Sequence, residues 1–390
     1  MNFMIKIYKF ALALILVLGM MVQTSFASSF ITLSGKTDSL EDITVLILKE
    51  GTNINDIKRT DIAYVTQERV NNDGSFSIIL PFESVENYLV RSNKDINIST
   101  GERNKTLYVS AATGSDTNDG ETSQSPLKTL DAAYGKLYMA SEIIILDDME
   151  LTLPNNSTGS FTIKGNTPLV NLALPAEISI SCNLCIDNIT LVNKSTIYAN
   201  GFKFKIGPDV SSADSANRLT VYGGKKNADY IGNTNLELLG GKYQAIYGGC
   251  NGGTVTGNTN VIFGGNSNIG EGIDDGNSTT LSPCYVYGGS NNAPVIGKTN
   301  VTLEENAVTK ALVGAGKGTN GTAQDTNIYI NGGKAAHVYG GSLNTELTDC
   351  DTHITMTGGL VEGIFGGSSS KNLKGNTYVT ILGGDISRRV

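Results

Sequence analysis

The sequence predicts an all-β protein in which a small β-sandwich precedes a parallel β-helix, a solenoid of stacked strands. Three observations predict this class. A motif ending in Gly-Gly recurs about every 25 or 26 residues in the second half of the chain, and a fixed period in this range is typical of stacked repeats. A second, strand-like motif recurs in phase with the first. Finally, short β-rich runs separated by turn residues fill residues 30–93.

The first 27 residues have the pattern of a signal peptide. Lys6 and Lys9 precede the apolar run Phe10–Val22, and small residues around Ala27 offer a cleavage site. The run is shorter than the roughly 20 apolar residues that a membrane helix needs. We therefore expect an exported protein, secreted or on the cell surface, with no membrane span in its mature segment.

Composition excludes some functions. The 390-residue chain has a net charge of −8, so it lacks the basic surface of a nucleic-acid-binding protein. Its five cysteines are an odd number, and no second Cys or His pair completes a zinc site around the Cys-x-x-Cys at 182–185. We expect small buried core residues at Cys182, Cys185, Cys250, Cys284 and Cys350.

Residues 30–93 contain several runs rich in β-branched and aromatic residues, and Asn71–Gly74 is predicted to be a hairpin turn. The pattern resembles the immunoglobulin-like or fibronectin-like accessory domains of secreted bacterial proteins. That resemblance implies a spacer or adhesion module. The polar residues 94–105 are predicted to be a linker.

Residues 106–217 are predicted to form the cap and the irregular turns of the solenoid. The segment 107–137 (LYVSAATGSDTNDGETSQSPLKTLDAAYGKL) resembles the opening segment of right-handed parallel β-helix proteins of the pectin-lyase-like superfamily. The matching residues are Tyr108, Val109, Gly114, Asp116, Asn118, Gly120, Pro126, Thr129, Leu130 and Ala133. A helix near the end of this segment would cover the first turn, which otherwise exposes an open edge.

Residues 218–390 carry the regular repeat. One motif reads TVYGG, AIYGG, YVYGG, ALVGA, HVYGG and GIFGG, and the other reads NTNLEL, NTNVIF, KTNVTL, DTNIYI, DTHITM and NTYVTI. Alternation in the second motif predicts a strand. Equivalent positions in successive copies form columns. The column that begins at Leu236 and ends at Val379 and the column that begins at Leu238 and ends at Ile381 should face the core. The column between them, which begins at Glu237 and ends at Thr380, should face outward. Each Gly-Gly is predicted to be a bend with close backbone packing or positive φ. The Asn residues beside the Thr column should form an amide ladder.

The last residues read as an unfinished repeat. Ile364 occupies the hydrophobic position of its motif, and one period of 26 residues later the chain has Val390. The sequence therefore predicts that the repeat array is C-terminally incomplete.

The resemblance implies two functional alternatives. Pectin-lyase-like enzymes carry catalytic groups on the outer face of a sheet: clustered aspartates in hydrolases, or acidic calcium ligands with a Lys or Arg base in lyases. Here the outward column offers Glu237 alone. We therefore favour a non-catalytic structural or adhesive surface protein, and keep a polysaccharide lyase or glycoside hydrolase as the alternative.

An aromatic column is the candidate ligand-binding feature. Exposed aromatic rings stack on sugars, so the partner would be an extracellular polysaccharide or cell-wall glycan. The polarity of the flanking columns favours an inward-facing core stack instead, and the sequence leaves both alternatives open. The column consists of Tyr222, Tyr247, Tyr287, Tyr339 and Phe365.

Two acidic groups are candidates for a calcium site, and no other cofactor is predicted. One lies in the opening segment and the other in the insertion 266–284, which lengthens one repeat. A hydrogen-bonded turn and a solvated loop are the favoured alternatives. The candidate ligands are Asp116, Asn118 and Asp119 in the first group, and Glu271, Asp274 and Asp275 in the second.

Overall fold

The computed structural model describes residues 29–36, 43–49, 52, 57–58, 61–68, 75–80, 88–92, 97–102, 105–137, 140–154, 160–268 and 284–389. The predicted signal peptide and the three acidic residues of the insertion, Glu271, Asp274 and Asp275, lie outside the described residues. So do the turn predicted at 71–74 and Val390.

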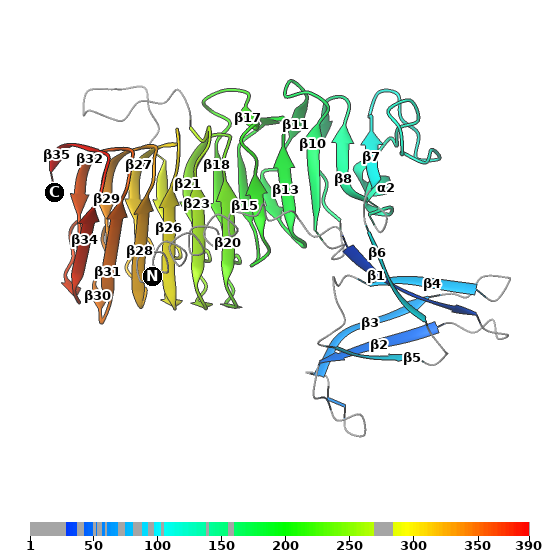
Figure 1. Cartoon of the computed structure of the whole chain (residues 1–390), viewed down its shortest axis with the longest axis horizontal. Helices are drawn as coiled ribbons and strands as arrows, with labels where there is room; N and C mark the ends of the chain where they lie inside the picture. The colour runs from blue at the N-terminus through cyan, green and yellow to red at the C-terminus, as the bar shows by residue number, and fades with distance from the viewer. Residues whose placement is uncertain are drawn as a thin grey trace, which may run out of the picture.

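The N-terminal strands form two antiparallel three-stranded sheets, which Figure 1 shows grouped apart from the longer sheets. Leu33, Phe76 and Ile78 from one sheet are buried, as are Ile43, Val45 and Ile47 from the other. One sheet has the order β4 (Ser75–Leu80), β1 (Ser29–Lys36), β6 (Asn97–Glu102), and the other β3 (Ile62–Glu68), β2 (Ile43–Lys49), β5 (Tyr88–Ser92).

The predicted linker differs from the structure. Residues 97–102 form β6 and pair antiparallel with β1, and β7 begins at Lys105. The sequence NISTGE is polar enough to read as a linker. Pairing with β1 nevertheless satisfies its backbone, which is what a strand needs irrespective of side-chain polarity.

The rest of the chain forms long parallel sheets in which neighbouring strands come from successive repeats (Figure 1). The arrangement is consistent with the parallel β-helix that the sequence predicts. The sheet that carries the Thr motif, called sheet 1 here, has eleven strands. They are β7 (Lys105–Val109), β8 (Ala140–Ile145), β10 (Phe161–Gly165), β13 (Leu184–Asp187), β16 (Phe204–Ile206), β20 (Thr234–Leu238), β23 (Thr259–Phe263), β26 (Lys298–Leu303), β28 (Asp325–Ile330), β31 (Asp351–Met356) and β34 (Thr377–Ile381).

Sheet 2 carries the Gly-Gly motif and has nine parallel strands. They are β12 (Glu177–Ser179), β15 (Ser195–Tyr198), β18 (Leu219–Tyr222), β21 (Tyr243–Tyr247), β24 (Tyr285–Tyr287), β27 (Val308–Val313), β29 (Lys334–Tyr339), β32 (Leu360–Phe365) and β35 (Asp385–Arg389).

Short strands complete most repeats. In the earlier repeats each short strand follows a strand of sheet 1, and all but the first precede a strand of sheet 2. They are β9 (Met149–Glu150), β11 (Asn171–Ala173), β14 (Thr190–Val192) and β17 (Ser211–Ser212). In the later repeats they follow sheet 2 and precede sheet 1: β19 (Tyr230–Ile231), β22 (Val255–Thr256), β25 (Val295–Ile296), β30 (Leu347–Thr348) and β33 (Leu373–Lys374). The position of the short strand within the repeat therefore changes partway along the stack, from after sheet 1 to after sheet 2.

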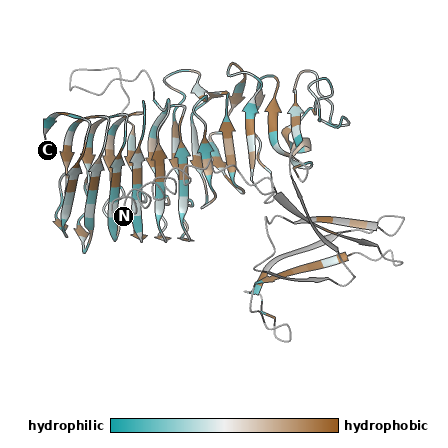
Figure 2. Cartoon of the chain, viewed as in Figure 1, coloured by the Kyte–Doolittle hydropathy of each residue, from teal (hydrophilic) through white to brown (hydrophobic). Residues whose placement is uncertain are grey.

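The predicted core columns are confirmed from β20 to β31. One buried column consists of Leu236, Val261, Val301, Ile328 and Ile354, and the other of Leu238, Phe263, Leu303, Ile330 and Met356. In each strand the residue between the two columns faces outward. Figure 2 shows the resulting alternation of apolar and polar positions along the strands. In β34, the outermost strand of sheet 1, Val379 is 36% exposed and Ile381 42% exposed.

The two kinds of Gly-Gly pair have different physical causes. In the Tyr-Gly-Gly motif a Cβ on Gly248 would lie 2.2 Å from the carbonyl oxygen of Gly288, so close backbone packing requires glycine. None of these motif glycines has positive φ. Positive φ instead occurs at the second glycine of the pairs that follow β20, β23, β28, β31 and β34, as at Gly241 and Gly333, and at Glu305 after β26. The sequence does not distinguish the two cases.

Buried threonines join the sheets. Thr259, Thr299 and Thr326 are completely buried. Each hydroxyl donates a hydrogen bond to the first glycine carbonyl of the following motif, over 2.5 to 2.6 Å. A buried hydroxyl needs such a partner, which explains why one residue type recurs at this position.

Candidate functional site

The outer face of sheet 1 carries the predicted amide ladder. The side-chain nitrogens of Asn260, Asn300 and Asn327 each donate to the amide oxygen of the preceding Asn, over 2.9 to 3.1 Å. His353 continues the column and stacks on Tyr378 at 4.7 Å between ring centroids. The ladder uses its hydrogen-bonding groups within the protein, so it is a structural feature of this face.

The aromatic column lies on the outer face of sheet 2. Val221, Ile246 and Val286 join the main core. Their neighbours Tyr222, Tyr247 and Tyr287 form a separate buried cluster with Tyr198, Ala311 and Val313. The preference for an inward core stack was therefore right about burial and wrong about direction. The Val and Ile residues face the core, the neighbouring tyrosines face outward, and the rings bury one another.

The geometry of the column explains this burial. Tyr222 and Tyr247 have ring centroids 4.6 Å apart and planes 5° apart, and Tyr247 and Tyr287 are 4.9 Å and 3° apart. The side-chain amide of Asn251 donates to the hydroxyl of Tyr198. Burial raises the pKa of Tyr222 to about 12 and raises the pKa of Tyr247 and Tyr287 further. The ring faces of these three tyrosines are not free to stack on a sugar.

The column is interrupted at β27. Its two outward positions carry Ala311 and Val313, where β24 carries Tyr285 and Tyr287 and β29 carries His337 and Tyr339. Small side chains between aromatic ones leave a hollow of about 390 Å³. The aromatic residues at its walls are only partly buried, apart from Tyr287. It is lined by Tyr285, Tyr287, Lys310, Ala311, Lys317, His337, Tyr339, Leu343, Asn344, Ser369 and Ser370.

The chemistry of this hollow suits binding better than catalysis. None of the described residues that line it is Asp or Glu. Its lining also includes the polar residues Lys310, Lys317, Asn344, Ser369 and Ser370. Aromatic walls with a few polar groups at the rim are typical of small-ligand sites. Sequence reasoning missed the hollow because it treated the aromatic column as continuous, although the ALVGA copy departs visibly from the others.

A group of charged residues lies on the outer face of sheet 1. Glu237 Oε1 lies 2.7 Å from Lys205 Nζ, and Glu237 Oε2 lies 4.0 Å from Lys203 Nζ. Lys164 and Glu142 pair over 2.6 Å two strands away. The sequence identified Glu237 alone, because its partners lie in the irregular repeats, where no column could be aligned. Each carboxylate faces an ammonium group, which is the arrangement of stabilising ion pairs.

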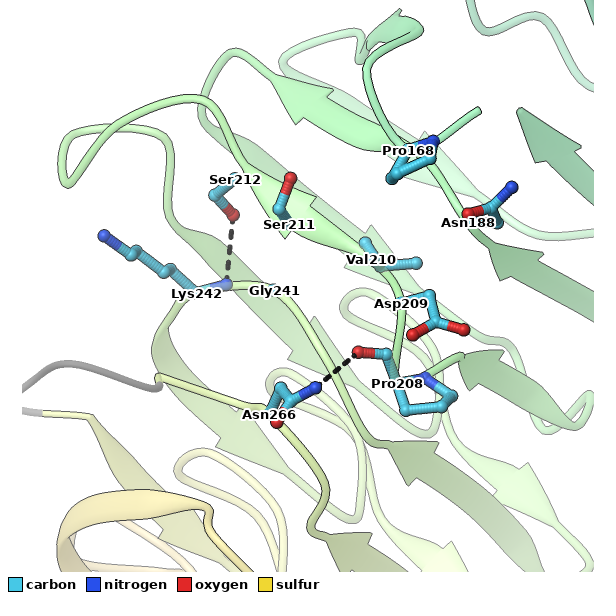
Figure 3. Close-up of a pocket in the computed structure, with 10 residues that line it drawn as sticks. All are labelled: Pro168, Asn188, Pro208, Asp209, Val210, Ser211, Ser212, Gly241, Lys242 and Asn266. Carbon is cyan, nitrogen blue, oxygen red and sulfur yellow. Dashed lines mark hydrogen bonds between the residues drawn. The ribbon is translucent and has the colours of Figure 1, made fainter. Parts of the chain in front are cut away.

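A second hollow of about 400 Å³ lies where β17 ends the first series of short strands (Figure 3). Pro168, Pro208 and Val210 give it apolar walls. Two of its polar groups already have partners: Asn266 donates to the Pro208 carbonyl over 3.1 Å, and Ser212 accepts from the Lys242 backbone over 3.0 Å. It holds neither a paired carboxylate nor an aromatic ring.

The acidic residues of the opening segment form hydrogen-bonded turns. Asp116 accepts from the backbone nitrogens of Lys128 and Thr129, and Thr129 caps α2 (Leu130–Tyr134). Asn118 donates to the Pro126 carbonyl, and Asp119 accepts from the Glu121 backbone. Across the described ranges, no three His, Cys, Asp or Glu side chains gather in a group that could hold a metal ion.

Comparisons with known proteins add no relative. No protein-family model matches the chain, no curated protein matches it, and no solved structure matches it. In the part of the chain that the structure describes, no helix is both long and apolar enough to cross a membrane.

Proposed function

We propose that this chain is an exported, cell-surface scaffold that binds glycans without catalysing a reaction on them. In this proposal residues 105–389 form a right-handed parallel β-helix of the pectin-lyase-like class, and the N-terminal sheets are an immunoglobulin-like spacer. The leader pattern of residues 1–27 supports export. No cofactor or bound calcium is needed.

One observation carries the proposal. The outer face of sheet 2 is an aromatic surface with a hollow opened by Ala311 and Val313, and no carboxylate lines that hollow among the described residues. Aromatic rings with a polar rim favour sugar binding. Hydrolysis of a glycoside would require a pair of carboxylates flanking the bond.

Binding of the full chain to a polysaccharide panel by affinity electrophoresis tests the proposal. We expect retardation by at least one extracellular or cell-wall glycan, and loss of that retardation in Tyr285→Ala. Tyr329→Ala is the matched control, because Tyr329 is a 41% exposed tyrosine on the other sheet. A chain that no glycan retards, or a Tyr285→Ala variant that behaves like wild type, would overturn the proposal.

A second function, polysaccharide lyase or glycoside hydrolase, is favoured by one observation, the contact of Glu237 with Lys205 over 2.7 Å. A carboxylate beside a lysine supplies an acid and a base. Release of unsaturated or reducing ends by the wild type, abolished in Glu237→Gln with retained folding, would establish this alternative. We expect no turnover.

A further inference from the structure

We infer that the hollow over Ala311 binds an anionic substituent of the glycan, a carboxylate, sulfate or phosphate group carried by a sugar ring. This inference rests on the proposed glycan binding and adds the chemical class of the ligand. It is carried by the charge of the groups that line the hollow, by the positions of two lysines around it, and by the pairing of acidic residues in the following repeats.

The titratable groups of the lining favour a negative ligand. The lining includes the basic side chains of Lys310, Lys317 and His337, and none of its described residues is Asp or Glu. The chain as a whole has the opposite balance, with 37 acidic residues against 29 Lys and Arg. A net charge of −8 repels anions over the surface as a whole. Attraction of an anion must therefore come from local groups such as these lysines, which act at contact distance.

The two lysines lie before and after the residues that open the hollow. Lys310 directly precedes Ala311 in β27, and that strand ends at Val313. Lys317 follows four residues later and forms a parallel bridge with Asn291 of the preceding repeat. Both lysines line the same hollow, and Lys317 is exposed. A ligand seated over Ala311 and Val313 therefore has an ammonium group on each side along the chain.

Acidic side chains of the following repeats have basic partners of their own. Glu346 Oε1 lies 3.3 Å from Lys374 Nζ, and Glu362 Oε2 lies 3.4 Å from Arg388 Nη1. Neither acid lines the hollow. These two carboxylates therefore do not neutralise the lysines of the lining.

The remaining groups of the lining suit the rest of such a ligand. Tyr285 is only partly buried, so it can contact the C–H groups of a sugar ring. His337 Nδ1 is buried and has no hydrogen-bond partner among the described residues. An orphaned buried nitrogen is uncommon in native proteins, and an oxyanion is a strong acceptor for an N–H group. The aromatic and basic groups thus match the two parts of an acidic sugar.

Calorimetry of the full chain with three matched pairs of polysaccharides tests the inference. Dextran sulfate is compared with dextran, carboxymethyl cellulose with hydroxyethyl cellulose, and phosphorylated mannan with mannan. We expect at least one charged polymer to bind roughly tenfold more tightly than its neutral partner, and the pair that responds identifies the oxyanion. Neutral partners that bind as tightly, or no binding by any charged polymer, would overturn the inference. The proposed function would still stand if a neutral glycan of the wider panel retarded the chain.

Titration with sodium acetate, sulfate and phosphate distinguishes a glycan substituent from a free ion. We expect the free ions to bind much more weakly than the charged polymer, because they lack the sugar ring that contacts Tyr285. A free ion that binds as tightly as the polymer would overturn the assignment to a glycan.

Replacement of one lysine tests the site itself. Lys317→Gln removes an exposed ammonium group and should weaken binding of the charged polymer by roughly fivefold, whereas Lys317→Arg should retain it. Lys334→Gln is the matched control, because Lys334 is an exposed lysine of β29 that does not line the hollow. Equal effects of Lys317→Gln and Lys334→Gln would show that general surface charge, and not this hollow, attracts the anion.

Discussion

The hydroxyl of Thr326 is completely buried and donates a hydrogen bond to the carbonyl oxygen of Gly340, over 2.6 Å. This bond joins a sheet 1 strand to the bend that follows the next sheet 2 strand. Thr234, Thr259, Thr299 and Thr352 make the same bond in their own repeats.

Thr326→Val should destabilise the protein by about 1–3 kcal/mol, because valine has nearly the same shape but leaves the buried Gly340 carbonyl without its donor. Urea unfolding followed by circular dichroism measures this change. Thr302→Val, in the outward column of β26, is the control and should change the unfolding free energy by no more than about 0.5 kcal/mol. Equal effects of the two substitutions would contradict a structural role for the bond.

Gly340→Ala should destabilise the protein by about 2 kcal/mol or more, because its Cβ would lie 2.2 Å from the carbonyl oxygen of Gly366. Gly367→Ala, at the second glycine of the next motif, is the control, because a Cβ there meets no atom within 4 Å. It should be neutral within about 0.5 kcal/mol. The melting temperatures of the two variants measure this difference. A Gly340→Ala variant as stable as the wild type would show that the bends pack less closely than described.

The stacked tyrosines of the aromatic column should make the folded protein less stable at alkaline pH. Burial raises the pKa of Tyr222 to about 12, above the value near 10 of an unfolded tyrosine. The unfolded chain therefore releases its proton first, and this stabilisation is present below pH 10 and is lost progressively between about pH 10 and 12. Ultraviolet difference spectra should show delayed tyrosine ionisation until the ladder unfolds. Tyr222→Phe should shift alkaline unfolding to higher pH, and an unchanged titration would contradict this.

All five cysteines should be inert in the native protein. None of the five, all within the described residues, forms a disulfide and all are buried, and burial raises the pKa of the Cys185 and Cys350 thiols to about 12. Since the thiolate is the reactive form, a thiol reagent should label them only after unfolding. Tyr329→Cys supplies an exposed thiol as a positive control. Rapid native labelling of any of the five original cysteines would contradict their burial.

Much of the architecture could be predicted because the repeat makes each position visible several times. The core columns beginning at Leu236 and Leu238 and the amide ladder from Asn235 to Asn327 follow directly from alternation. The buried cysteines follow from residue type. For the core columns, alternation within one strand determines which face each residue takes.

The aromatic column could not be placed by the same reasoning. Tyr222 and Val221 are both buried although they lie on opposite faces of β18, because stacking with Tyr198 and Tyr247 hides an outward ring. That burial depends on contacts between repeats. The pairing of Lys205 with Glu237 also depends on strands in register across irregular repeats. The β6 strand was missed because backbone pairing, not side-chain pattern, defines it.

The Thr–Gly and Asn–Asn bonds recur between successive repeats, so each repeat carries its own alignment signal. Duplicating one regular repeat of about 26 residues would extend the stack by roughly 4.8 Å and would reproduce these hydrogen bonds between repeats. The reach of such a protein can therefore change in uniform steps by simple gene duplication. Its aromatic hollow, by contrast, depends on the single irregular copy around Ala311. The length of the stack and the shape of the hollow are thus encoded by different repeats, and a lineage could alter one without disturbing the other.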